Sequence, residues 1–86
     1  MPKYTFIHDP GHGWLKVPLA EIEALGIGEQ ITAFSFRDNE FAYLEEDQDM
    51  GIFWEANREI GETLSEADLE REYVDYFSRN RPSFWE

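Results

Sequence analysis

Apolar and polar residues alternate in two short runs near the start of the chain, Lys3 to Ile7 and Trp14 to Val17. Alternation with a period of two is typical of strands that bury one side. The segment between them, Asp9 to Gly13, is dense in residues that form turns. We therefore expect residues 3–17 to form a β-hairpin.

After the hairpin the hydrophobic period becomes helical. Leu19, Ile22 and Leu25 recur at helical spacing behind a proline, which is tolerated in the first turn of a helix because its missing N–H would have no partner there. Glycines at positions 26 and 28 predict the end of this short helix.

Two further strands are predicted over residues 31–37 and 41–45, joined by a tight turn at Asp38 and Asn39. One side of each strand is aromatic, so the pair is expected to form a cross-strand ladder. The residues that share these sides are Thr32, Phe34 and Phe36 on the first strand, and Phe41 and Tyr43 on the second.

A longer helix is expected from Met50 to Ile60, capped by Asp47 or Asp49 and ended by Gly61. Ser65 then resembles the cap of another short helix, because acids occupy the turn that follows it. Residues 72–77 are predicted either to continue that helix or to form a fifth strand.

The resulting order is β-β-α-β-β-α with an open end, which predicts an α+β fold. We expect an antiparallel sheet of four strands, or five if residues 72–77 pair, with two to three short helices on one face. Residues 1–86 are expected to form a single domain, because a chain of this length supports one core. Pro82 favours an extended tail over residues 78–86.

The charge of the chain is concentrated in its middle. Fourteen carboxylates and two arginines lie between residues 38 and 75, which account for the whole net charge of −12. Such a field attracts cations and basic protein surfaces, and it repels nucleic acid and anionic membranes. The predicted partner is therefore a basic protein surface, with no direct binding of nucleic acid and no membrane association.

The candidate binding surface is an acidic stripe, which would continue along a helix from Glu55 through Glu59 and Glu62 to Glu66 with neighbours about 5–6 Å apart. Gly61 is expected to interrupt this helix, so the stripe bends or breaks there. Further acids extend the surface, and three aromatic residues are candidate anchors for a partner. The complete predicted set is Glu55, Glu59, Glu62, Glu66, Asp68, Glu70, Glu72, Asp75, Trp54, Tyr73 and Trp85. Solvated helix faces are the alternative interpretation of these acids.

The chain contains no cysteine, which excludes disulfides and thiolate chemistry and favours the cytoplasm. No run of apolar residues is long enough to cross a membrane. His8 and His12 could bind a metal together with Glu45, Glu46 or Asp47, but their spacing matches no standard metal motif. The four serines lie in no nucleophile-elbow motif. We therefore predict no metal, no cofactor and no enzymatic activity.

The runs His8 to Leu15 and Tyr43 to Asp47, with Arg79-Asn80, resemble a pattern found in small uncharacterised proteins of bacteria, phages and mobile elements. The resemblance implies a phage or mobile-element setting, and hence the cytoplasm of a host cell. We expect a small acidic inhibitor of a basic, nucleic-acid-handling protein, such as an anti-CRISPR protein or another nucleic-acid mimic. A homodimeric interaction module and a metal-dependent enzyme are the alternatives.

Overall fold

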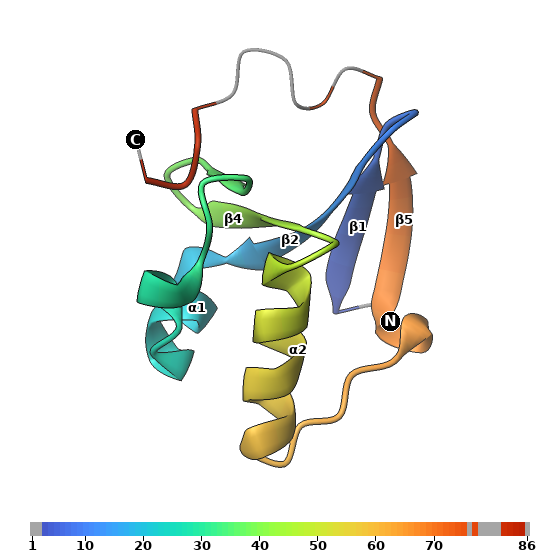
Figure 1. The fold of residues 1–86 in the computed structure, drawn as a ribbon. Helices are drawn as coiled ribbons and strands as arrows, with labels where there is room; N and C mark the ends of the chain where they lie inside the picture. Colours follow the sequence, from blue (N-terminus) through green and yellow to red (C-terminus); the bar gives the residue numbers. More distant parts are fainter. Residues whose placement is uncertain (1–2, 76, 78–81, 86) are drawn as a thin grey trace.

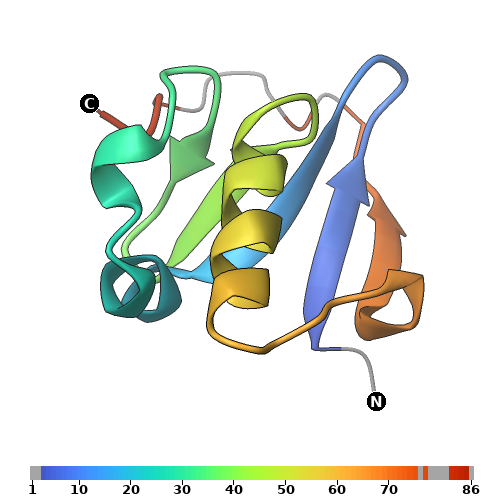
Figure 2. The same cartoon turned by 60° about the horizontal axis from the view of Figure 1, so that its bottom comes forward.

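The computed structural model describes residues 3–75, 77 and 82–85. The strands are β1 (Tyr4–His8), β2 (Gly13–Pro18), β3 (Phe36–Arg37), β4 (Phe41–Glu45) and β5 (Leu69–Tyr73), and the helices are α1 (Leu19–Leu25), α2 (Asp49–Glu59) and the 3₁₀ helices η1 (Gly28–Gln30) and η2 (Glu66–Asp68). The strands form one sheet in the order β3-β4-β2-β1-β5, with α1 and α2 on the same side (Figures 1 and 2). The predicted α+β class is confirmed.

The predicted hairpin of β1 and β2 is present, with Phe6 opposite Leu15. The first residue of β2, Gly13, is buried, and a Cβ atom built on it would lie 2.3 Å from the ring of Phe6. Only a glycine therefore lets the Phe6 ring lie across the start of β2.

The side of the sheet that faces the helices carries the main core. Phe53 of α2 is fully buried there, and its ring meets that of Tyr4 edge-on at 5.4 Å. Deleting a buried side chain of this size costs about 3–5 kcal/mol of stability in comparable cores. The buried members of this cluster are Leu15, Val17, Ile22, Ile27, Ile31, Ala42, Leu44, Phe53, Leu64 and Phe84.

The opposite side of the sheet carries a second, aromatic cluster of Ile7, Trp14, Tyr43 and Phe77. Phe77 comes from the chain beyond β5 and packs its ring 5.0 Å from that of Trp14 and 5.2 Å from that of Tyr43. Because successive strand residues point to opposite sides, the two clusters use alternate positions of β2 and β4.

The strand predicted over residues 31–37 is mostly absent, since only Phe36–Arg37 pair with β4. The aromatic pair Phe36–Tyr43 of the predicted ladder is confirmed, but Phe34 is 70% exposed. Residues 31–35 instead form a loop in which Thr32 and Ser35 bond to Asp49. Side-chain hydrogen bonds thus replace the ladder that the alternation of this segment predicted.

The sheet is mixed rather than wholly antiparallel, because β5 runs parallel to β1 at the edge. Gly61, with φ of 87°, ends α2 as predicted, and the chain then returns to the far edge of the sheet (Figure 2). The predicted helix after Ser65 is only the single turn η2, although Ser65 and Asp68 do form its capping box. From Leu69 onward the backbone pairs with β1, and this pairing overrides the short helical signal.

Candidate functional site

The predicted acidic residues lie on several elements instead of one helix. Glu55 and Glu59 belong to α2, Glu62 lies in the loop after it, and Glu66 belongs to η2. A continuous helical stripe is therefore wrong, because α2 ends at Glu59 and positive φ at Gly61 turns the chain away from the helix axis. All these residues are exposed except Asp68, which is half-buried and belongs to the η2 capping box.

The last acids of the set lie on the other side of the sheet. In the register with β1, Glu70 is opposite Thr5 and Glu72 is opposite Ile7. These positions alternate with those of Leu69, which packs on the helix-side core. Glu66, which pairs with Arg71, therefore lies on one side of the β5 edge, and Glu70 and Glu72 lie on the other. Glu55 and Glu59 lie elsewhere, on the face of α2 that borders a hollow also lined by Ile27 and Gln30.

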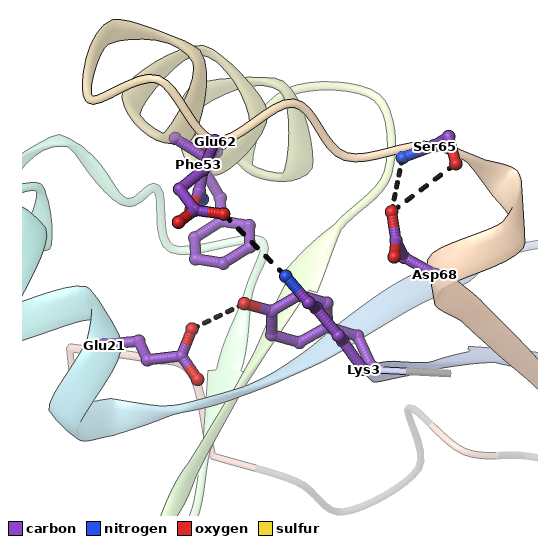
Figure 3. A network of polar contacts seen from close by, with 8 residues as sticks. Lys3, Glu21, Phe53, Glu62, Ser65 and Asp68 are labelled. Carbon is purple, nitrogen blue, oxygen red and sulfur yellow. Dashed lines mark hydrogen bonds and ion pairs between the residues drawn. The ribbon is translucent and has the colours of Figure 1, made fainter. Parts of the chain in front are cut away.

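Three described cations pair with acids of the predicted set and partly neutralise their charge. Lys3 Nζ lies 3.8 Å from Glu62 (Figure 3), and Arg71 bonds Glu66 at 2.8 Å. Arg58 pairs with Glu55 within α2. All three pairs are exposed, so solvent screening leaves each of them with little effect on stability. Among the described residues Glu59, Glu70 and Glu72 form no ion pair. Glu70 and Glu72 therefore leave unbalanced negative charge at the β5 edge, and Glu59 leaves it at the end of α2.

The three predicted aromatic anchors have different environments. Trp54 is half-buried against the main core, so most of its surface serves folding. Tyr73 is 56% exposed beside the β5 acids, with its ring 5.4 Å from that of His8. Trp85 is equally exposed but lies at the opposite edge, where its indole N–H donates to the carbonyl of Ile31. Only Tyr73 combines exposure with proximity to the acids.

Asp49 has a role that its sequence position did not reveal. It was predicted as a helix cap, but it is fully buried in the first turn of α2 and accepts hydrogen bonds from the Thr32 backbone at 3.0 Å and its hydroxyl at 2.7 Å. The Ser35 hydroxyl also donates to Asp49 and accepts from the backbone N–H of Glu45 at 2.9 Å. The carboxylate thus joins the 31–35 loop, β4 and α2.

A second polar network lies where β1 meets α1 (Figure 3). The Tyr4 hydroxyl donates to Glu21 at 2.6 Å. Burial, this hydrogen bond and the charges of Glu21, Glu62 and Asp68 raise the pKa of Tyr4 well above 10. Tyr4 is therefore a neutral donor within a negative environment, and the sequence offered no signal for this because the partners come from separate elements.

The His8–Trp14 segment is an ordered turn. Asp9 accepts backbone N–H bonds from Gly11 at 3.1 Å and His12 at 3.0 Å, while His8 packs on Tyr73. Among the residues that the structure describes, no three His, Asp or Glu side chains come close enough to hold a metal ion. The metal alternative built on His8, His12 and the acids of residues 45–47 therefore has no geometric support.

Within the described ranges, no helix has both the length and the apolar character needed to cross a bilayer. Comparisons with protein-family models, with curated proteins and with solved structures found no match to this chain. Arg79 and Arg81 lie outside the described residues.

Proposed function

We propose that this chain is a small acidic binding protein that engages a basic protein surface through the carboxylates around the β5 edge. The observation that supports it most is the exposure of its negative charge. Eleven of the fourteen carboxylates between residues 38 and 75 are exposed, and only one, Asp49, is buried. Self-repulsion of this kind opposes folding, whereas a basic partner would relieve it.

The partner class follows from electrostatics. A basic groove of a nucleic-acid-handling protein offers many cations in one place, and contact with the acidic edge would release counterions from both surfaces. Inhibitors of phage or mobile-element origin, anti-CRISPR proteins among them, are the class that the sequence resemblance implies. Because Glu66 lies on one side of the β5 edge and Glu70 and Glu72 lie on the other, we infer recognition of a concave basic surface rather than imitation of a phosphate row.

A homodimeric module is the second candidate, and it would use the exposed edge of β5. This strand carries Glu70, Arg71 and Glu72, and charged residues on an edge strand oppose edge-to-edge pairing. Light scattering at tens of micromolar distinguishes the two candidates, because the acidic binding protein is expected to be monomeric there.

The direct experiment reverses Glu66, Glu70 and Glu72, which lie at the β5 edge, to lysine and compares capture of partners from a host-cell lysate at low and high salt. We expect the wild type to retain a defined basic protein, identified by mass spectrometry, that both high salt and the triple reversal release. The matched control reverses Glu23, Glu29 and Glu40, which are exposed and lie away from this edge. Capture that resists salt, or that both reversals weaken equally, contradicts a binding site at the β5 edge.

A further inference from the structure

A cavity of about 490 Å³ opens at the end of the sheet where β2 begins and β4 ends. Trp14 and Glu45 are paired across these strands and lie on the side opposite the helices. The rest of its lining comes from Ala33 and Phe34 of the 31–35 loop, Phe36 of β3, Asp47 and Gln48 after β4, and His12 at the tip of the hairpin. Its volume is within the range of small-ligand sites, about 300–1,000 Å³.

The cavity has an aromatic wall. The Trp14 ring lies 5.7 Å from that of Phe36 and 5.6 Å from that of His12. Phe34 also lines the cavity, although it is the most exposed large hydrophobic residue described. Hydrogen bonds from Thr32 and Ser35 to Asp49 anchor the loop that carries Phe34, and pairing with Tyr43 of β4 holds Phe36. The wall is thus held in place before any ligand binds.

Two carboxylates complete the lining, Glu45 and Asp47, and no lysine or arginine is among the residues that line this cavity. Neither acid forms an ion pair within the described part of the chain. Burial is the largest cause that raises the pKa of Glu45, and the charge of Asp47 adds to it. A cation placed beside Glu45 would offset both effects.

One donor at the cavity is also unsatisfied. Trp14 is 2% exposed, and its indole N–H has no acceptor among the described residues. A buried donor without a partner destabilises a fold. The carboxylates and the aromatic rings of the lining favour a ligand that is both planar and positively charged, as the side chain of an arginine residue is.

We propose that this cavity receives an arginine side chain from the basic partner, with the guanidinium stacked on the aromatic wall and paired with Glu45 and Asp47. Arginine fits better than lysine, because its planar group both stacks on rings and bonds carboxylates through two N–H groups. This site rests on the proposed binding of a basic protein and adds to it a specific anchor, which lies away from the acidic β5 edge.

The test titrates the ¹⁵N-labelled full chain with the peptide acetyl-Gly-Arg-Gly-amide at low salt and follows the indole N–H resonances. Trp54→Phe and Trp85→Phe variants assign the Trp14 signal by elimination. We expect saturable movement of the Trp14 signal with the arginine peptide and none with its citrulline analogue, which has nearly the same shape but no charge. Equal response to the two peptides would overturn the proposal.

Variants then locate the site. Glu45→Gln is expected to weaken binding about tenfold through loss of a charge-assisted hydrogen bond. Phe34→Ala is expected to weaken it about threefold through loss of ring contact, without a large effect on folding because Phe34 is exposed. Glu23→Gln on α1 makes the same change in net charge outside the cavity and is expected to alter binding less than about twofold.

The possible outcomes distinguish the arginine site from the proposed binding of a basic protein at the β5 edge. If Glu23→Gln weakens binding as much as Glu45→Gln, the peptide responds only to net charge and the cavity is not the site. If the peptide leaves Trp14 unmoved while the whole protein still captures a basic partner at low salt, the cavity proposal fails and the acidic-edge function stands. If the peptide binds as expected but no basic protein is captured, the arginine site stands and the β5-edge function fails.

Discussion

The two ends of α2 carry carboxylates with opposite roles. Asp49, in the first turn, is fully buried and accepts hydrogen bonds from two residues of the 31–35 loop. Glu59, the last residue, is exposed and forms no ion pair among the described residues. The first position is favoured by the positive end of the helix dipole and the second is opposed by the negative end. Acids that accept hydrogen bonds therefore stabilise this fold, whereas acids that face solvent only charge its surface.

The largest expected effect of a substitution on stability is at Asp49. Asp49→Ala leaves the Thr32 N–H and the Thr32 and Ser35 hydroxyls without their acceptor inside the protein, which is expected to lower the free energy of unfolding by about 3 kcal/mol. Urea denaturation measures this loss, with Glu23→Gln as the exposed control. A loss below about 0.5 kcal/mol, the range typical of surface substitutions, would show that the carboxylate does not hold the loop.

The next effect is at the Tyr4–Glu21 hydrogen bond. Tyr4→Phe is expected to lower stability by about 1 kcal/mol at neutral pH. The pKa of the Tyr4 phenol is raised in the fold above its ordinary 10.0, so its contribution is present in full below pH 10 and is lost as the pH rises further. The difference between wild type and variant should therefore shrink in urea titrations above pH 10. A difference that stays constant there would contradict this assignment.

A smaller effect is expected at Asp38, which is exposed. The hydroxyl of Tyr43, at 2.6 Å, is the main cause that lowers the pKa of Asp38 below its ordinary 3.8, and backbone N–H groups of Glu40 and Phe41 add to it. The resulting stability is present above pH 3.8 and is lost as the pH falls below it. Tyr43→Phe should raise the pKa of Asp38, measured by NMR titration of its carboxyl carbon. An unchanged pKa would show that the backbone N–H groups of Glu40 and Phe41 lower the pKa of Asp38 without the Tyr43 hydroxyl.

The smallest effect, with the opposite sign, is expected at Glu59. Glu59→Lys removes an acid from the negative end of α2 and places a lysine one helical turn after Glu55, so stability should rise by about 0.5 kcal/mol. Thermal and urea denaturation can measure this gain. A loss of stability would mean that Glu59 has a structural role like that of Asp49.

Sequence periodicity predicted the helix-side half of this molecule well, because β1, β2, α1, β4 and α2 each carry their own apolar pattern. The acidic stripe was predicted less well, since its spacing assumed that a helix continues past Gly61. The cavity residues Phe34 and Phe36 were predicted only as members of a strand. Their common site depends on Asp49, which comes from a different element and binds the loop through side-chain contacts that periodicity does not report.

By itself, the sequence determined the class of the fold, the two helices, the hairpin and the sign of the surface charge, because each depends on local spacing or on composition. Only the tertiary structure decided that β5 pairs parallel to β1, that Asp49 is buried and that acids lie on both sides of the β5 edge. These features depend on which distant segments meet. Hydrogen bonds and packing between segments decide that, and no local pattern in either segment encodes the partner.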